Sequence, residues 1–365
     1  MKNRQIFICI VFLFFIALFP MSYFVTRDYI DTSNNENREL RKMPELSLDN
    51  IELFPLEFES YYNDCLPYKN QLTRWNSMLT LAVYGESASD SVTVGKDGWL
   101  FYTTKTDGMP MEQYFGRDLY TSEELAFIAD NLMATQTYLE EQNIEFVVFI
   151  APNKERIYHE YLPSHYDEPA DMYGAKQVIE YLEENTKLRI VYAYDALMKE
   201  KEVSPNTTLY YLTDSHWNRA GGYVGTRELL KELDIELPSL QEVKLEENNY
   251  GNFDLAGLMN LRNVYKKDIN YSISGYGEDN LVNEKYDFNT EYIYHNEGMD
   301  PRRLFVIRDS FADAMDGFLA SQFNESHMVH NTYFSQSMIE EWQPDIVVYE
   351  CVERYIDRLL EFRME

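Results

Sequence analysis

Apolar and polar residues are distributed along the chain in a pattern that predicts alternating strands and helices. Residues 144–152 ("IEFVVFIAP") form a nearly continuous apolar run that ends in a turn, which is typical of a strand buried on both faces. Helical apolar spacing is found in residues 122–142, 219–233 and 312–322. Further strands are predicted in "KLRIVYAYD", "RRLFVIRDSF", "HMVHNTYF" and "PDIVVYECVERYIDRLLEF", the last leading into a C-terminal helix. This alternation predicts an α/β fold with a parallel sheet flanked by helices on both faces.

Three other regions do not follow this alternation. Residues 51–85 have spaced apolar positions that predict helices, and residues 91–103 ("SVTVGKDGWLFYT") predict a β-hairpin with its turn at Gly-Lys-Asp-Gly. Residues 235–303 are rich in Tyr and Asn. We expect this last region to be an insertion of loops and hairpins over one edge of the sheet.

The N-terminus predicts a membrane anchor. Residues 6–25 carry no charge and are long enough to cross a bilayer as a helix, and Lys2 and Arg4 precede them on the expected cytoplasmic side. A cleaved signal peptide is the alternative, although "FPMSYFVTRDY" offers no clear A-x-A cleavage site. The predicted organisation is therefore an anchor or signal at 1–26, a polar linker at 27–50, and one domain at 51–365 that includes the insertion. That domain would lie outside the cytoplasm, or would be secreted if the segment is cleaved.

Composition excludes several classes of protein. The 365 residues carry 62 acidic against 32 basic side chains, a net charge of −30, which disfavours nucleic acid and anionic lipid as main partners. Three cysteines are too few for a disulfide scaffold, and whether Cys65 and Cys351 pair is left open. The chain has no CxxC motif and its six histidines are scattered, so we predict neither a metal site nor a cofactor.

Polar clusters occur at or near the ends of the predicted strands, where parallel α/β sheets bind their ligands. "APNKERIY" holds Asn153 and Lys154, "TDSHW" holds Asp214 and His216, and "RDSF" holds Ser310 at a strand-to-helix turn. A serine becomes a nucleophile when an imidazole accepts its proton, and a carboxylate sets the tautomer of that imidazole. These residues therefore predict a hydrolytic triad of Asp214, His216 and Ser310.

Each of these residues also has a purely structural interpretation. Asp214 could be the N-cap of the helix that begins near Asn218, and Ser310 could be the N-cap of its own helix. His216 could be a core histidine beside Trp217. Arg308 and Asp309 could form a surface ion pair. The triad is favoured because three residues of triad type are predicted at one edge of one sheet.

Five segments, taken together and in order, resemble a known family. "VGKDGWLFY", "APNKERIYHEYLP", "TDSHWNRAGG", "RDSF" and "VVYECVERY" resemble the SGNH hydrolase-like domain of alginate O-acetyltransferases and of the related DHHW proteins. The resemblance spans roughly residues 36 to 360 and implies an SGNH-like, flavodoxin-like fold. It also implies that Asp214 and His216 are the acid and base and that Ser310 is the nucleophile. Two departures are Ser215 within "DSHW" and "RDS" in place of the usual "GDS".

The resemblance further implies an extracytoplasmic O-acetyltransferase that forms an acetyl-serine and acetylates a polysaccharide or cell-wall glycan. A membrane-bound O-acyltransferase would supply the acetyl group. Arg308 and Asn153 are candidate oxyanion or substrate-binding residues. Lys154 could be a substrate ligand or a structural ion-pair partner, and the Trp217 ring could stack on a sugar. An acetylesterase and a catalytically silent glycan-binding or assembly subunit are the alternatives. The net charge favours a neutral or zwitterionic acceptor.

Overall fold

A computed structural model describes residues 2–30, 40–48, 50–66, 68–249, 251, 253–265 and 268–365. The chain forms two compact units. One consists of Met1–Ser89 together with Ala256–Val264, and the other of Asp90–Leu255 together with Tyr265–Glu365. The predicted boundaries at residues 26 and 50 stay predictions, and residues 31–39 and 49 of the predicted linker lie outside the described residues.

The first unit is helical. It contains α1 (Lys2–Thr26), a short 3₁₀-helix η1 (Arg27–Tyr29), α2 (Phe54–Asp64) and α3 (Lys69–Tyr84), so the helices predicted in residues 51–85 are present. Across the described part of the chain, no helix combines the length and apolar character needed to cross a bilayer. The predicted N-terminal anchor is therefore not supported.

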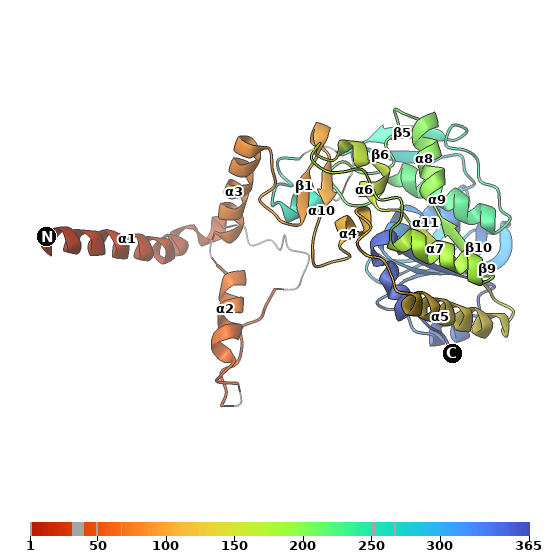
Figure 1. Ribbon diagram of the computed structural model, residues 1–365, viewed down its shortest axis with the longest axis horizontal. Helices are drawn as coiled ribbons and strands as arrows, with labels where there is room; N and C mark the ends of the chain where they lie inside the picture. The colour runs from red at the N-terminus through yellow and green to blue at the C-terminus, as the bar shows by residue number, and fades with distance from the viewer. Residues whose placement is uncertain are drawn as a thin grey trace. The chain divides into compact units, whose positions relative to one another are not determined.

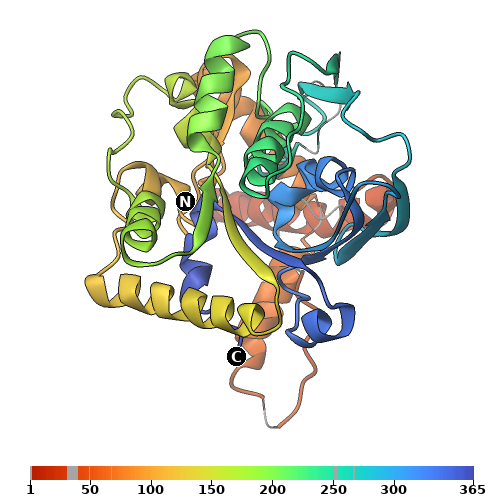
Figure 2. The ribbon, with the colours of Figure 1, turned by 90° about the vertical axis from the view of Figure 1, so that its right-hand side faces the viewer.

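The second unit is built on a seven-stranded sheet with the strand order β4-β3-β11-β9-β10-β8-β7 (Figure 2). Five strands are parallel, and β8 and β7 are added to one edge through antiparallel pairing, β8 with β10 and β7 with β8. The strands are β3 (Glu145–Ala151), β4 (Arg189–Tyr192), β7 (Val282–Asp287), β8 (Glu291–His295), β9 (Asp300–Arg308), β10 (Phe323–His330) and β11 (Ile346–Val352). The strands predicted from apolar runs are thus present, and the sheet is mixed rather than wholly parallel.

The strand order differs from that of flavodoxin. Numbered along the chain, the parallel strands lie in the order 2-1-5-3-4, whereas flavodoxin-like sheets have the order 2-1-3-4-5. The last strand, β11, lies between β3 and β9. The turns that follow Ala151, Val352 and Arg308 therefore come from three neighbouring strands at the same edge of the sheet.

Helices cover both faces of the sheet, as Figures 1 and 2 show. Strand β3 alternates, with Phe146 and Val148 packing against α5 (Ser122–Glu140) and α7 (Gly174–Asn185). Val147 and Phe149 point to the opposite face, where α8 (Tyr194–Val203), α9 (Arg219–Glu232) and α11 (Asp316–Ala320) supply the core. The predicted helix at 312–322 is a 3₁₀ turn, η4 (Ser310–Ala314), followed by α11. The predicted C-terminal helix is also 3₁₀, η5 (Glu353–Leu360).

Smaller elements complete the unit. The predicted hairpin is present as β1 (Val92–Val94) and β2 (Leu100–Tyr102), with Val94 opposite Leu100. The remaining elements are the 3₁₀-helices η2 (Lys96–Gly98) and η3 (His159–Tyr161), the helices α4 (Pro110–Tyr114), α6 (Lys154–Ile157) and α12 (Ser337–Trp342), and the paired strands β5 (Lys244–Asn248) and β6 (Asn270–Ser274). Helix α10 (Asp254–Leu258) begins in this unit and continues in residues of the first. Within the described residues, Cys65 and Cys351 are both free thiols.

Candidate active site

The turn after β9 presents Ser310. Asp309 is the N-cap of η4, because its Oδ1 accepts a hydrogen bond of 2.8 Å from the Phe311 amide. Its Oδ2 accepts another of 2.8 Å from the Val352 amide at the end of β11. The cap is therefore Asp309 and not Ser310, whose hydroxyl is left for other partners. Arg308 and Asp309 are 0% and 3% exposed, which excludes the surface ion pair considered above.

A buried acid on the neighbouring strand supports this turn. Glu350 lies in β11, is fully buried, and its Oε2 accepts a hydrogen bond of 2.8 Å from the Asp309 amide. Burial and the adjacent Asp309 carboxylate raise the pKa of Glu350 well above its usual range. Burial thus favours the neutral form of Glu350.

The loop before α9 presents Asp214 and His216. A single β-bridge between Tyr210 and Trp217 closes the base of this loop. The cap of α9 is Asn218, whose Oδ1 accepts hydrogen bonds from two amides of the first helical turn, at 3.0 and 3.2 Å. Asp214 is therefore not the N-cap, and its carboxylate is free to act on His216.

Two contacts hold this loop against the serine turn. The indole Nε1 of Trp217 donates a hydrogen bond of 2.7 Å to the Phe311 carbonyl. Helix α9 approaches so closely that a Cβ on Gly222 would lie 2.4 Å from the carbonyl oxygen of Ala314. A glycine is needed there, which explains the Gly-Gly pair that follows the histidine in the sequence.

Hydrogen bonds join the three predicted triad residues, from Asp214 to His216 and from His216 to Ser310. Nδ1 of His216 is 2.7 Å from Oδ1 of Asp214, and Nε2 of His216 is 2.8 Å from Oγ of Ser310. Asp214 is 1% exposed, whereas a quarter of the His216 side chain is open to solvent. The structure thus brings the three residues together, with the carboxylate buried and the imidazole accessible.

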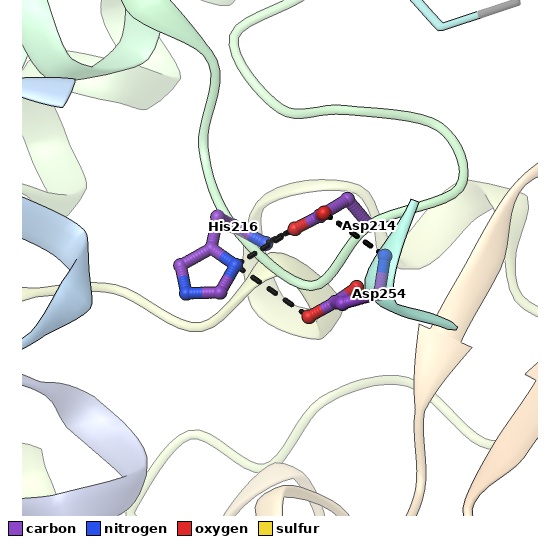
Figure 3. A group of neighbouring side chains, drawn as sticks. All are labelled: Asp214, His216 and Asp254. Carbon is purple, nitrogen blue, oxygen red and sulfur yellow. Dashed lines mark hydrogen bonds and ion pairs between the residues drawn. The ribbon is translucent and has the colours of Figure 1, made fainter. Parts of the chain in front are cut away.

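A second carboxylate lies at the same imidazole, as Figure 3 shows. Oδ2 of Asp254 is 3.5 Å from Nδ1 of His216, and the Asp254 amide donates a hydrogen bond of 3.1 Å to Oδ2 of Asp214. The amide and hydroxyl of Ser215 both donate to Asp254, at 2.7 and 2.5 Å. Asp254 was missed in the sequence because nothing local distinguishes it from the many other acidic residues.

The two carboxylates decide the charge of the imidazole. Burial lowers the pKa of His216, but Asp214 and Asp254 outweigh this effect and raise that pKa to about 10. Burial and the charge of Asp254 raise the pKa of Asp214. For Asp254, burial acts in the same upward direction, but hydrogen bonds from His216 and Ser215 prevail and lower its pKa to about 2. The free site therefore holds an imidazolium between carboxylates at neutral pH.

Asp214, His216 and Asp254 are also close enough together to be ligands of one metal ion. In the described residues, one ligand atom from each of Asp214, His216 and Asp254 lies within 4.8 Å of the others. Direct hydrogen bonds and an ion pair among these atoms account for their proximity without an ion.

Lys154 is part of the scaffold. Its side chain is fully buried, and Nζ donates hydrogen bonds to the carbonyls of Leu100, Leu212 and Asp214 at 2.6, 3.0 and 2.9 Å. An ammonium group has three donors, so none is left for a substrate or for an ion pair. Lys154 instead joins the hairpin to the loop that bears Asp214.

Asn153 and Trp217 are also buried, at 2% and 1% exposure. The Nδ2 group of Asn153 donates to Gln113 at 3.0 Å, and the Trp217 ring packs near Phe149 and Phe311. A ring without exposed surface cannot stack on a sugar, so the expectation for Trp217 is wrong.

Arg308 is buried under the serine. Its Nη1 donates to Oδ1 of Asp313 at 2.8 Å, its Nη2 donates to the Phe288 carbonyl at 3.2 Å, and its guanidinium lies 4.2 Å from the centre of the Tyr292 ring. Burial raises the pKa of Asp313 to about 6, against the opposing charge of Arg308. The ion pair compensates the charge of Arg308, which argues against its predicted role in binding an anionic group.

Ser310 opens onto a pocket of about 350 Å³. The pocket is lined by Phe288, Asn289, Arg308, Ser310, Asp313, His330 and Tyr333. A larger cavity of about 740 Å³ lies beside β4 and α7, and the described residues that line it include none of Asp214, His216 and Ser310. We therefore assign the candidate chemistry to the smaller pocket.

Comparison with known proteins confirms the resemblance inferred from the sequence motifs. Residues 92–263 match the family model described as SGNH hydrolase-like domain, acetyltransferase AlgX. The matched segment contains Asp214, His216 and Asp254 and ends before Ser310. This segment of the chain is therefore similar to an SGNH hydrolase-like domain of the acetyltransferase type. A comparison with curated proteins found no match.

Solved structures share the fold. PatB1 of Bacillus cereus is 14% identical with a TM-score of 0.53, over 74% of this chain and 99% of that one. Its form with a sulfonyl adduct is 15% identical with a TM-score of 0.51, over 75% and 100%. A DHHW family protein from Eubacterium siraeum is 16% identical with a TM-score of 0.50, over 74% and 99%. At such identities the likeness establishes the architecture.

Proposed function

We propose that this protein is an extracytoplasmic O-acetyltransferase that transfers an acetyl group through Ser310 to a hydroxyl of a polysaccharide or cell-wall glycan. The observation that carries the proposal is the hydrogen-bonded series from Asp214 to His216 to Ser310, with heavy-atom distances of 2.7 and 2.8 Å. The match to an acetyltransferase family model supports acyl transfer as the reaction class. As the family resemblance implies, a membrane-bound O-acyltransferase would deliver the acetyl group.

In the first half-reaction, Ser310 Oγ attacks the acetyl carbonyl of the donor. Neutral His216 accepts the hydroxyl proton at Nε2, while Asp214 accepts a hydrogen bond from Nδ1 and stabilises the imidazolium that forms. The tetrahedral adduct collapses, the bond between the acetyl carbon and the leaving group breaks, and the leaving group takes the proton from His216. The products are acetyl-Ser310 and the deacetylated donor.

The second half-reaction reverses these steps with a new nucleophile. A sugar hydroxyl attacks acetyl-Ser310 and gives its proton to Nε2 of His216, and the bond between Ser310 Oγ and the acetyl carbon breaks. His216 returns the proton to Ser310, so the enzyme is regenerated and the sugar carries an O-acetyl group. If water attacks instead, the products are acetate and free enzyme, and the protein is an acetylesterase.

The test uses the full chain with a chromogenic aryl acetate as donor. We expect turnover, and mass spectrometry should find one acetyl group on Ser310. Ser310→Ala and His216→Ala should each lower the rate by about 10³-fold or more with the fold intact, because each removes a member of the relay. Ser164→Ala, which changes an exposed serine outside the site, is the matched control. Folded wild-type protein with neither turnover nor adduct would overturn the proposal and favour the silent glycan-binding subunit.

A further inference from the structure

The pocket beside Ser310 has two exposed aromatic walls. Phe288 and Tyr333 are 50% and 54% exposed although both line the cavity that contains the serine. Other aromatic rings of this chain are exposed as well, among them Phe127, but Phe288 and Tyr333 both border the pocket that contains Ser310. An aromatic ring offers a flat apolar surface, which suits the C–H face of a sugar ring.

The turns that carry these rings are fixed in place. The carbonyl of Phe288, in the turn between β7 and β8, accepts a hydrogen bond from buried Arg308 at 3.2 Å. The next part of this turn is joined to β10, since the His330 amide donates to the Thr290 carbonyl at 2.8 Å. Tyr333 lies in the turn that follows β10, and its amide donates a hydrogen bond of 2.8 Å to the His330 carbonyl. Both walls are therefore preorganised, which reduces the entropy lost when a ligand binds.

Among the described residues that line the pocket, no positive charge is left uncompensated. Arg308 is paired with Asp313 at 2.8 Å. Burial and the charge of Arg308 lower the pKa of His330, which leaves its imidazole neutral at physiological pH. Asn289 and Ser310 supply neutral polar groups. An anionic ring would meet no free cation here and would also face the net charge of −30 of the whole chain.

We infer that this pocket is the acceptor subsite and that it binds a neutral pyranose ring between Phe288 and Tyr333, next to Ser310. Its volume of about 350 Å³ lies within the range of small-ligand sites. The inference deepens the proposed function and rests on it, because the sugar held there would present its hydroxyl to acetyl-Ser310. Arg308 then acts as a buried support for one wall and not as a ligand for an anion.

A kinetic experiment tests the two walls with the full chain, an aryl acetate donor and cellopentaose as the neutral acceptor. Phe288→Ala and Tyr333→Ala should each raise the KM for cellopentaose by about tenfold, a change larger than any in the hydrolysis of the donor by water. Phe288→Tyr and Tyr333→Phe keep the rings and should restore most of the affinity. Phe127→Ala removes a ring that is 54% exposed on α5, outside the pocket, and serves as the matched control. Equal effects of Phe127→Ala and the wall variants, or unchanged KM values, would refute the inference.

A binding experiment separates this inference from the proposed chemistry. Calorimetry with the Ser310→Ala protein should detect cellopentaose, with weaker binding when either wall ring is also removed, and a galacturonate pentamer should bind less well. Binding that survives loss of both rings, preference for the galacturonate, or no binding of cellopentaose would overturn the subsite. If cellopentaose binds between the rings but wild-type protein forms no acetyl-serine, the subsite stands and the transferase mechanism fails.

Discussion

The two sides of the candidate site are held by different kinds of interaction. We call residues 308–314 the serine turn and residues 208–218 the histidine loop. The serine turn is attached to the sheet. The Asp309 carboxylate caps η4 and also accepts a hydrogen bond from the Val352 amide of β11. The Asp309 amide donates a hydrogen bond to the side chain of Glu350, which lies in β11. These partners belong to the neighbouring strand β11, so the sheet itself positions the proposed nucleophile.

The histidine loop depends on side chains from distant segments. Lys154 donates to two of its carbonyls, those of Leu212 and Asp214. The carboxylate of Asp268 accepts from the amides of Leu212 and Thr213 at 2.6 and 2.9 Å. Asp254 binds the loop from another direction. A few single side chains thus position the proposed base, and remote substitutions should therefore disturb His216 more than Ser310.

The largest effect is expected for Asp214→Asn. An amide in place of the carboxylate favours the wrong tautomer of His216 and no longer stabilises its imidazolium, so kcat for aryl acetate should fall by about 10⁴-fold. Circular dichroism and the thermal midpoint report whether the fold survives. Asp195→Asn, an exposed acid on α8, is the control. A fall of less than about tenfold in kcat would remove Asp214 from the relay.

Lys154→Met should be the next most disruptive change. It leaves the Leu100, Leu212 and Asp214 carbonyls without their buried donor, and we expect a loss of about 3 kcal/mol in the free energy of unfolding. Activity should fall as well, because the main chain at Asp214 loses its tether. Urea denaturation measures the effect, with the exposed Lys231→Met as control. A loss below about 1 kcal/mol would mean that the histidine loop does not need this support.

The dependence of the rate on pH tests Asp254. His216 is a base only when neutral, and its pKa is raised to about 10, so the rate of ester cleavage should increase from neutral pH to about pH 10. Asp254→Asn removes a negative charge that favours the imidazolium. The midpoint should then move to lower pH by about one unit, which raises the rate at pH 7 several-fold. Rate profiles and NMR titration of the His216 ring measure this shift, and a midpoint that stays or moves upward would contradict the assignment.

The smallest effect is expected on the serine side, for Glu350→Gln. Burial raises the pKa of Glu350 and so favours its neutral form, and glutamine keeps an oxygen that can accept from the Asp309 amide. Stability should therefore change by less than about 1 kcal/mol and the rate by only a few-fold. Glu350→Ala, which removes the acceptor and leaves a cavity, is the contrasting variant. A large loss in Glu350→Gln would show that the serine turn relies on a charged Glu350.

Local patterns in the sequence predicted most elements of the second unit. The apolar run of β3 and the strand that ends at Arg308 are recognisable because a buried strand needs apolar side chains on both faces. Long-range order was less accessible. The position of β11 between β3 and β9 and the antiparallel strands β7 and β8 depend on which strands pair, and pairing is not encoded in any short segment.

The candidate site divides in the same way. Asp214, His216 and Ser310 are conspicuous in sequence because their residue types and their places near strand ends suit a relay. Asp254 was not found, because its role depends on a close approach between segments 40 residues apart. Lys154, as a substrate ligand or ion-pair partner, and Trp217, as a sugar-stacking ring, were predicted without knowledge of their burial, since a sequence gives residue type only.

Which segments become strands and helices, and which residue types are available for acyl transfer, thus follow from the amino-acid sequence alone. These properties depend on neighbouring residues and on intrinsic chemistry. Only the tertiary structure decided that Lys154 holds a loop, that Asp254 shares the imidazole of His216, and that Phe288 and Tyr333 remain exposed beside Ser310. Burial, charge compensation and hydrogen-bond partners arise when distant segments pack together, so they are properties of the folded chain as a whole.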